Sequence, residues 1–168
     1  ARLLRSSASW PSPGIVMLTG IALFLLYLLL ALSPPMWYDP LTYHLAIPAD
    51  YLRNGGVTSD TFNSYRFMPP AMSMLYMYLM GLGSDYLPKL LHLFLAGMLL
   101  FSLHSWARRN SDSTVAALAT LLFASQWAVQ QGVERANVDF HFAFYSFMAF
   151  IVILEKRKGT WDASDQIK

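Results

Sequence analysis

The polar residues most suited to chemistry gather between positions 33 and 89 of the chain. Tyr43 and His44 follow Asp39 at intervals of four and five residues, and a spacing of four places two side chains on one helix face. A carboxylate at a partly dry surface can act as a general base, because desolvation raises its pKa. Arg53 and Arg66 lie farther along, and guanidinium groups hold phosphate well. The pattern predicts chemistry on a lipid-linked phosphate substrate.

A second polar group lies near position 135. It contains Glu134, Arg135 and Asp139. If this loop emerges beside Asp39, two carboxylates from separate loops line one cavity. Simpler interpretations stay open: Asp39 and Asp139 are common helix N-caps, and exposed arginines often contact lipid headgroups.

Metal binding is the weaker interpretation of these residues. His44 and His141, with Asp39 and Asp139, offer ligands for a divalent ion, but no HxH or HExxH spacing supports such a site. We therefore predict no metal and no cofactor. His92 and His104 fall within an apolar run and are interpreted as packing residues.

Composition places these residues in a membrane protein. The chain is 55% hydrophobic and 13% charged, against about 25% charged residues in soluble domains. No charged residue occurs between Arg5 and Asp39. The net charge of +2 comes with basic residues in short clusters, which argues against a nucleic-acid partner. The chain has no cysteine, which excludes disulfides and thiolate chemistry.

Four apolar segments predict an all-α, polytopic bundle: 14–32, 90–107, 114–129 and 138–154. Basic residues precede the first segment and close the second and fourth, which predicts a cytoplasmic location for these ends. Residues 1–13 are then a cytoplasmic segment, 14–154 the membrane bundle, and 155–168 a cytoplasmic tail. The loop 33–89 lies on the outer or periplasmic side of the inner membrane.

Within that loop, two further helices are expected at the membrane surface. Asp39-Pro40 is a helix-start signal. An apolar stripe follows and ends at residues 54–56, and it consists of Leu41, Leu45, Pro48 and Leu52. Segment 69–82 is apolar but short, which favours an interfacial or re-entrant helix. The alternative is a fifth span.

The run YDPLTYHL at 38–45, with Pro48, Tyr51-Leu52 and the glycines at 55 and 56, resembles membrane glycosyltransferases of the GT-C superfamily. It is most similar to family 39, which includes dolichyl-phosphate-mannose and aminoarabinose transferases. FMPP at 67–70 occupies the position of the family's Pro-Pro element, although Met68 replaces the usual basic residue. ANVD at 136–139 resembles the family's second acidic position. The resemblance covers residues 34–154.

This resemblance implies an enzyme that takes a sugar from a polyprenyl-phosphate donor outside the cytoplasmic membrane. Asp39 would be the general base and Asp139 a supporting carboxylate, while Tyr43 and His44 support the site. Arg66, Arg53 and Arg135 would neutralise the donor phosphate. Family members usually have more spans, so we expect either an N-terminal portion or a shortened relative, in both cases too short to act alone.

Two other functions remain open. A reduced copy of the fold could serve as a non-catalytic scaffold subunit, with the bilayer and other membrane subunits as partners. A transporter is less supported, because the predicted spans carry few interior charges.

Overall fold

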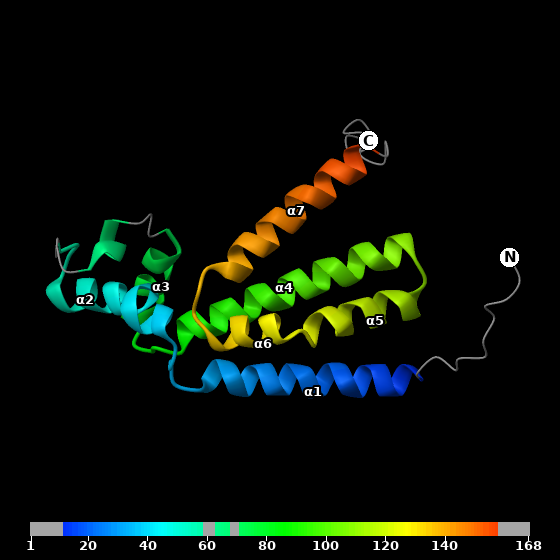
Figure 1. Cartoon of the computed structure of the whole chain (residues 1–168), viewed down its shortest axis with the longest axis horizontal. Helices are drawn as coiled ribbons and strands as arrows, with labels where there is room; N and C mark the ends of the chain where they lie inside the picture. Colours follow the sequence, from blue (N-terminus) through cyan, green and yellow to red (C-terminus); the bar gives the residue numbers. More distant parts are fainter. Residues whose placement is uncertain (1–11, 59–62, 68–70, 158–168) are drawn as a thin grey trace, which may run out of the picture.

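The computed structural model describes residues 12–58, 63–67 and 71–157, and their regular structure is entirely helical. The predicted all-α fold is therefore confirmed. Figure 1 shows the elements in chain order: α1 (Pro13–Leu32), η1 (Pro40–His44), α2 (Ala46–Asn54), η2 (Ser64–Phe67), α3 (Ala71–Gly81), α4 (Leu87–Asn110), α5 (Ser113–Ala124), α6 (Trp127–Glu134) and α7 (Asp139–Arg157).

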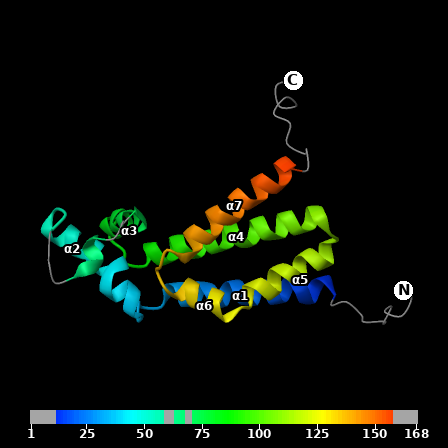
Figure 2. The ribbon, with the colours of Figure 1, turned by 45° about the horizontal axis from the view of Figure 1, so that its top comes forward.

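The elements form an elongated bundle with a small cap at one end. Helices α1, α4 and α5 run alongside one another, and α6 continues α5 toward the cap (Figures 1 and 2). The cap comprises η1, α2 and α3. Helices α1 and α5 run toward the cap, whereas α4 and α7 run away from it. The α4–α5 turn and the end of α7 therefore lie at the end of the molecule remote from the cap.

Two helices in the described residues are long and apolar enough to cross a membrane. They are Gly14–Leu32, with a mean hydropathy of 2.8, and Leu87–Asn110, with 1.6. Both coincide with predicted spans. Most side chains of α1 are not covered by the rest of the chain, because only 11% of its apolar window is buried. Helix α7 starts one residue after its predicted position, with Asp139 at one end and Glu155, Lys156 and Arg157 at the other.

The predicted third span is not one helix. Segment 114–129 is interrupted after Ala124, and Gln126 has an extended backbone with ψ of 135°. The side chains of Ser125 and Gln126 each donate to the Leu122 carbonyl at 3.0 Å. Such local bonds compete with continued helix formation. Tyr27 of α1 donates its hydroxyl proton to the Ala124 carbonyl, which satisfies one end of the break.

Helix α3 is too short to be a fifth span. Its 11 residues extend about 16 Å at 1.5 Å per residue, about half of a bilayer's hydrocarbon core. The helix contacts α2 in the cap and the start of α4. The Pro-Pro element at 69–70 lies outside the described residues.

The predicted surface helix beginning at Asp39 consists of two parts. Residues Pro40–His44 form a π-helical turn, in which the Leu45 amide donates to the Pro40 carbonyl at 3.0 Å. A regular α-helix follows and ends at Gly55, whose φ of 68° requires the left-handed conformation that glycine adopts readily. The wider turn shifts the helix phase, so the predicted stripe is wrong in part: Leu45 and Pro48 are buried, but Leu41 and Leu52 are exposed.

The core joins α1, α4, α6 and α7. Its buried members are Tyr27, Ala31, Leu95, Ala96, Leu99, Val129, Val133 and Phe140. A buried cation borders this core: Lys89 donates to the carbonyl oxygens of Leu30 and Ser33 and to the Ser33 hydroxyl at 3.2 Å. A cation at a helix C-terminus complements the helix dipole. Lys89 thus fixes the end of α1 from which the chain enters the cap.

Candidate functional site

Asp39 lies immediately before the π-helical turn and is not used as a helix cap. Its backbone is already helical, with φ of −62° and ψ of −51°, and its side chain makes no capping hydrogen bond. The carboxylate instead interacts with the Tyr43 hydroxyl. Asp39 is partly exposed. The capping interpretation is therefore wrong for this residue, whose carboxylate instead interacts with a phenol.

Tyr43 connects Asp39 to the rest of the cap. Its ring stacks on Tyr65 with a centroid distance of 4.4 Å and an interplanar angle of 14°. The His44 ring lies 4.2 Å away. Burial and the Asp39 carboxylate raise the pKa of Tyr43 to about 12, with smaller contributions from Tyr65 and Asp139. Tyr43 consequently remains a neutral hydrogen-bond donor at physiological pH.

His44 is buried below the same turn. Its Nδ1 atom lies 3.4 Å from the Ser73 hydroxyl of α3. Burial lowers the pKa of His44, while the charges of Asp39 and Asp139 oppose this shift. Both carboxylates therefore act electrostatically on both Tyr43 and His44. The charges of the two predicted acidic residues thus reach the same tyrosine and histidine, although the two acids are 100 positions apart in the sequence.

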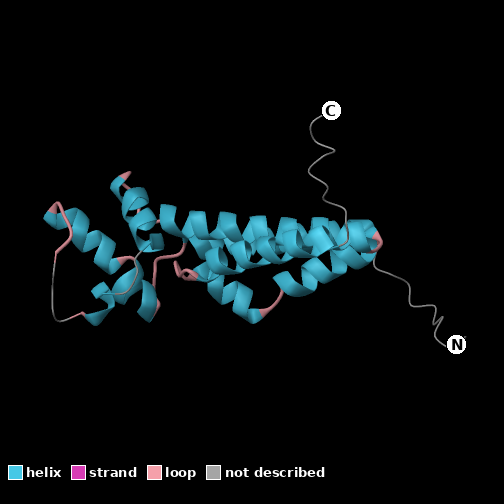
Figure 3. Cartoon of the chain, turned by 90° about the horizontal axis from the view of Figure 1, so that it is seen from above, coloured by secondary structure: helices cyan, strands magenta, loops and turns pink. Residues whose placement is uncertain are grey.

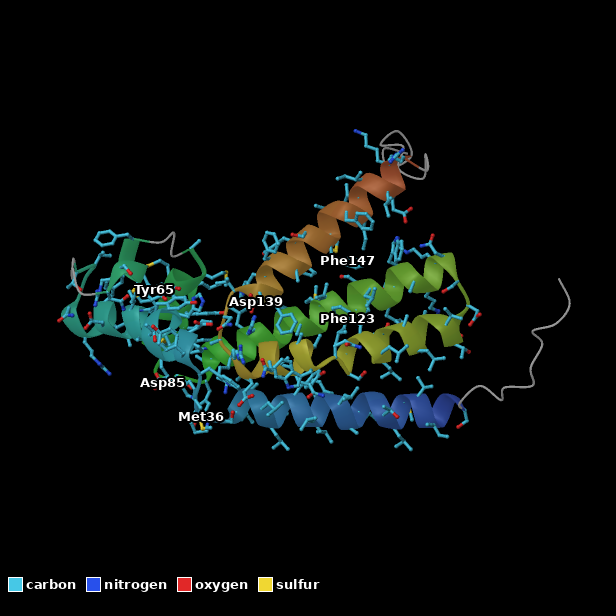
Figure 4. All side chains as sticks on the ribbon, in the orientation of Figure 1. Met36, Tyr65, Asp85, Phe123, Asp139 and Phe147 are labelled. Carbon is cyan, nitrogen blue, oxygen red and sulfur yellow. The ribbon has the colours of Figure 1, made fainter. Side chains whose placement is uncertain are left out.

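Asp139 enters this site from the start of α7. Figure 4 shows it at the end of α7 that faces the cap. Its Oδ2 atom accepts from Asn137 Nδ2 at 3.3 Å, and the backbone carbonyl of Asn137 accepts from the buried Tyr76 hydroxyl. The loop that carries Asp139 is thus attached to α3.

His92 attaches the same loop to α4. Its Nε2 atom accepts from the Phe140 amide at 3.3 Å, and its Nδ1 atom lies 2.6 Å from the Arg135 carbonyl oxygen. We assign the Nδ1–H tautomer, since it satisfies both contacts. His92 is fully buried. It is the packing residue that the sequence predicted, but it also determines where Asp139 begins α7.

Arg135 is the predicted basic residue most closely associated with the segment of Asp39. Its guanidinium carbon lies 3.8 Å from the centroid of the Trp37 ring, two residues before Asp39. Its Nη2 atom donates to Gln131 Oε1 at 2.6 Å. Within the described residues no ion pair involves Arg135, and its Nε atom lacks a hydrogen-bond partner. Its positive charge is therefore not neutralised by a carboxylate of the described chain.

The Arg66 side chain is bonded to other residues of the cap. It forms an ion pair with Asp50 and donates to the Thr58 carbonyl at 3.2 Å and the Thr58 hydroxyl at 2.9 Å. The guanidinium carbon also lies 5.3 Å from the centroid of the Tyr51 ring. This pair holds the pKa of the Asp50 carboxyl below its usual value. Arg66 thus attaches η2 to α2, and Arg53 is exposed on the last turn of α2.

The alternative metal set does not assemble. Among the described residues, no three histidine, aspartate or glutamate side chains are placed to hold one ion. The His141 ring stacks on His92 with a centroid distance of 5.6 Å, on the α4 side of the loop. His44 contacts Ser73 instead.

Sequence reasoning missed three residues that shape this site: Trp37, Tyr65 and Ser73. Trp37 had a usable signal, because an aromatic residue two positions from a candidate base can hold a cation. Tyr65 and Ser73 contact the π-helical turn only because the cap folds these separate segments together. No family model, no curated protein and no solved structure matches the chain.

Proposed function

We propose that this chain is the N-terminal part of a glycosyltransferase that uses a polyprenyl-phosphate-sugar donor at the outer face of the membrane. One observation carries the proposal: Asp39 and Asp139, from separate segments, act on the same Tyr43–His44 pair. Asp39 is the general base in this proposal. The neutral Tyr43 hydroxyl orients its carboxylate, and the partial exposure of Asp39 leaves it accessible to an acceptor.

The reaction is a displacement at the anomeric carbon of the donor sugar. An acceptor hydroxyl or amine forms a bond to that carbon while Asp39 removes its proton. The bond between the carbon and the phosphate oxygen breaks, and its electron pair leaves with the polyprenyl phosphate. Arg135 is the residue we assign to the phosphate charge, because it has no carboxylate partner in the described chain. Arg66 is a weaker candidate because Asp50 neutralises it.

The membrane arrangement supports this substrate class. We infer that α1, α4, α7 and the α5–α6 pair cross the cytoplasmic membrane, with the cap outside. The alternating helix directions agree with that topology. The described basic residues Arg108, Arg109, Lys156 and Arg157 all lie at the end remote from the cap. A lipid-linked donor would keep its chain beside the bundle and its phosphate near the cap.

Sugar transfer by the complete protein in membranes tests the proposal. The probes are polyprenyl-phosphate mannose and polyprenyl-phosphate aminoarabinose with radiolabelled sugars, and the readout is label transferred to other membrane components. Removing a general base typically costs about 10²–10⁴-fold in rate, so Asp39→Asn should lose at least the lower value. The control is Asp85→Asn, the same change at an exposed residue before α4 (Figure 4). Wild-type transfer by Asp39→Asn would reject Asp39 as the base.

The scaffold function is the competing proposal, and one observation favours it. Helix α7 exposes large apolar side chains, with Phe142 at 77%, Tyr145 at 65% and Phe150 at 51% exposure. A subunit partner could cover this face. Co-purification of the complete membrane assembly separates the two functions. A scaffold loses its partners when Phe142 and Tyr145 are changed to serine, and it has no transfer activity. The enzyme is inactivated by Asp39→Asn, and its assembly stays intact.

A further inference from the structure

A cavity of about 430 Å³ lies between α4 and α7, in the half of the bundle remote from the cap. Figures 1 and 2 show why it exists: α7 starts close to α4 and diverges from it toward its C-terminus. Trp106 of α4, which lines the cavity, and Phe147 of α7 form an aromatic pair between the two helices with a centroid distance of 6.4 Å. The volume falls within the about 300–1,000 Å³ typical of small-molecule sites.

The lining of this cavity has two chemical characters. The apolar lining residues include Phe101 of α4 and Met148, Ile151 and Val152 of α7. The polar lining residues include Ser102, Ser105 and Arg109 of α4 and Glu155 of α7. The indole N–H of Trp106, which also lines the cavity, has no hydrogen-bond partner in the described chain. A ligand that matches both the apolar and the polar lining residues has a hydrocarbon part beside an anionic or hydrogen-bond-accepting head.

The charges around the cavity favour an anionic head. Among the described residues at this end of the bundle, four are basic and two are acidic: Arg108, Arg109, Lys156, Arg157, Asp112 and Glu155. Glu155 lines the cavity but already has an interaction within the chain. Asp112 is occupied as the N-cap of α5, since it accepts from the amides of Thr114 and Val115. Arg109 is therefore the principal charge available to a ligand in this space.

We propose that the α4–α7 cavity binds an anionic phospholipid, with its phosphate near Arg109 and an acyl chain against Met148 and Ile151. Basic pockets between membrane helices on the cytoplasmic side commonly bind such headgroups. The site is distinct from Asp139, which lies at the opposite end of α7, and from Asp39, which lies before η1 of the cap. The inference rests on the membrane arrangement proposed above, but it does not depend on the transferase chemistry.

Native mass spectrometry of the purified full-length protein in detergent tests the site. The probes are phosphatidylglycerol and phosphatidylcholine, titrated separately. One basic residue near an anionic headgroup contributes about 1 kcal/mol, or about fivefold in affinity. The wild type should therefore prefer phosphatidylglycerol by about this factor, and Arg109→Gln should remove the preference. Arg108→Gln is the matched control, because Arg108 is the neighbouring exposed residue and does not line the cavity.

Further variants keep the test decisive if Arg109→Gln fails to fold. Arg109→Lys keeps the charge and should keep the preference, and Met148→Trp fills the cavity and should reduce binding of both lipids. Equal binding of the two lipids by the folded wild type would overturn the proposal, as would an equal loss in Arg108→Gln and Arg109→Gln. A change of oligomeric state in Met148→Trp, with lipid binding intact, would also overturn it, since another protein segment would then occupy the cavity. None of these three results would affect the sugar-transfer test at Asp39.

Discussion

The Nδ1 atom of His92 lies 2.6 Å from the carbonyl oxygen of Arg135, although 43 positions separate the two residues. The other ring nitrogen accepts from the Phe140 amide at 3.3 Å. One buried imidazole therefore joins the end of α6 to the start of α7. Because Arg135 and Asp139 lie on the two sides of this junction, His92 sets the relative positions of a candidate phosphate-binding cation and a candidate carboxylate.

Replacing His92 with phenylalanine should destabilise the protein and displace Asp139. Phenylalanine keeps the ring but leaves the Arg135 carbonyl and the Phe140 amide without partners. An unsatisfied buried polar group costs about 1–3 kcal/mol. We expect a lower thermal midpoint in detergent and a loss of sugar transfer. His104→Phe is the control, because His104 is on the same helix but makes only a 3.4 Å contact with Thr120. An unchanged midpoint in His92→Phe would show that this junction does not depend on the imidazole.

Lys89→Met should destabilise the junction between α1 and the cap. The substitution retains most of the aliphatic side chain but removes the ammonium group from the carbonyls of Leu30 and Ser33. Hydrogen bonds to charged groups contribute about 1.5–3 kcal/mol each, so we expect a loss of about 2 kcal/mol or more. Lys156→Met makes the same change at an exposed lysine and should leave the thermal midpoint unchanged. Equal midpoints for the two variants would contradict the capping role.

The sequence predicted the helical elements well where apolar composition alone decides them. The start and end of α1 follow from a long apolar run that ends before two prolines, and α2 ends at Gly55 because only glycine adopts that φ readily. Asp139 was correctly placed at the start of α7. These signals are local, so they can be read without knowing the fold.

Features that depend on long-range contacts could not be read in this way. The ammonium group of Lys89 bonds to Ser33, the residue that follows α1, 56 positions earlier in the sequence. The interruption after Ala124 is supported by Tyr27, 97 positions away. The π-helical turn changes which face of the 40–54 segment is buried, and periodicity analysis assumes a regular helix. The ion pair between Arg66 and Asp50 was missed because it also depends on how separate segments fold together.

The Asp50–Arg66 ion pair should make the cap sensitive to acid. Because the folded-state pKa of Asp50 is lowered, its contribution to stability is present above the unfolded pKa of about 3.9. That contribution is lost as the pH falls through the folded-state pKa. Limited proteolysis of the exposed 55–57 segment should accelerate at acid pH in the wild type. Asp50→Asn should show the faster cleavage at neutral pH as well. A wild-type cleavage pattern in Asp50→Asn at neutral pH would show that other contacts of Arg66 suffice.

Tyr43→Phe should lower the rate of sugar transfer and remove a pH-dependent contribution to the free energy of unfolding. The variant loses the hydroxyl that interacts with Asp39; a polar contact contributes about 1 kcal/mol, so we expect a several-fold slower rate with the ring stack on Tyr65 kept. The folded-state pKa of Tyr43 is raised to about 12. Its stabilising contribution is therefore complete below the unfolded value of about 10 and is lost as the pH rises through the folded value.

Thermal midpoints at neutral and strongly alkaline pH measure that contribution. The wild type should lose more stability than Tyr43→Phe on going to alkaline pH. Tyr78→Phe, at a residue 66% exposed, is the control and should behave as the wild type. An identical alkaline loss in all three proteins would show that Tyr43 makes no contribution to the pH dependence.

Cysteine labelling should place the two ends of the bundle on opposite sides of the membrane. The chain has no native cysteine, so a single introduced thiol reports one position without background. Val57→Cys lies just after α2 in the cap, at a residue 76% exposed, and Ser111→Cys lies in the exposed turn between α4 and α5. Helix α4 joins the two ends (Figure 1), and Figure 3 shows the helices of the bundle side by side from above. The 24 residues of α4 extend about 36 Å, enough for a hydrocarbon core of about 30 Å.

With the cap outside, an impermeant maleimide should label Val57→Cys in spheroplasts and label Ser111→Cys only after permeabilisation. Labelling of Ser111→Cys alone in spheroplasts would invert the topology, and the candidate base Asp39 would then face the cytoplasm. Labelling of both positions would mean that α4 does not cross the membrane. Either result would separate the site from a donor presented on the outer face, since the phosphate must reach the same side as Asp39.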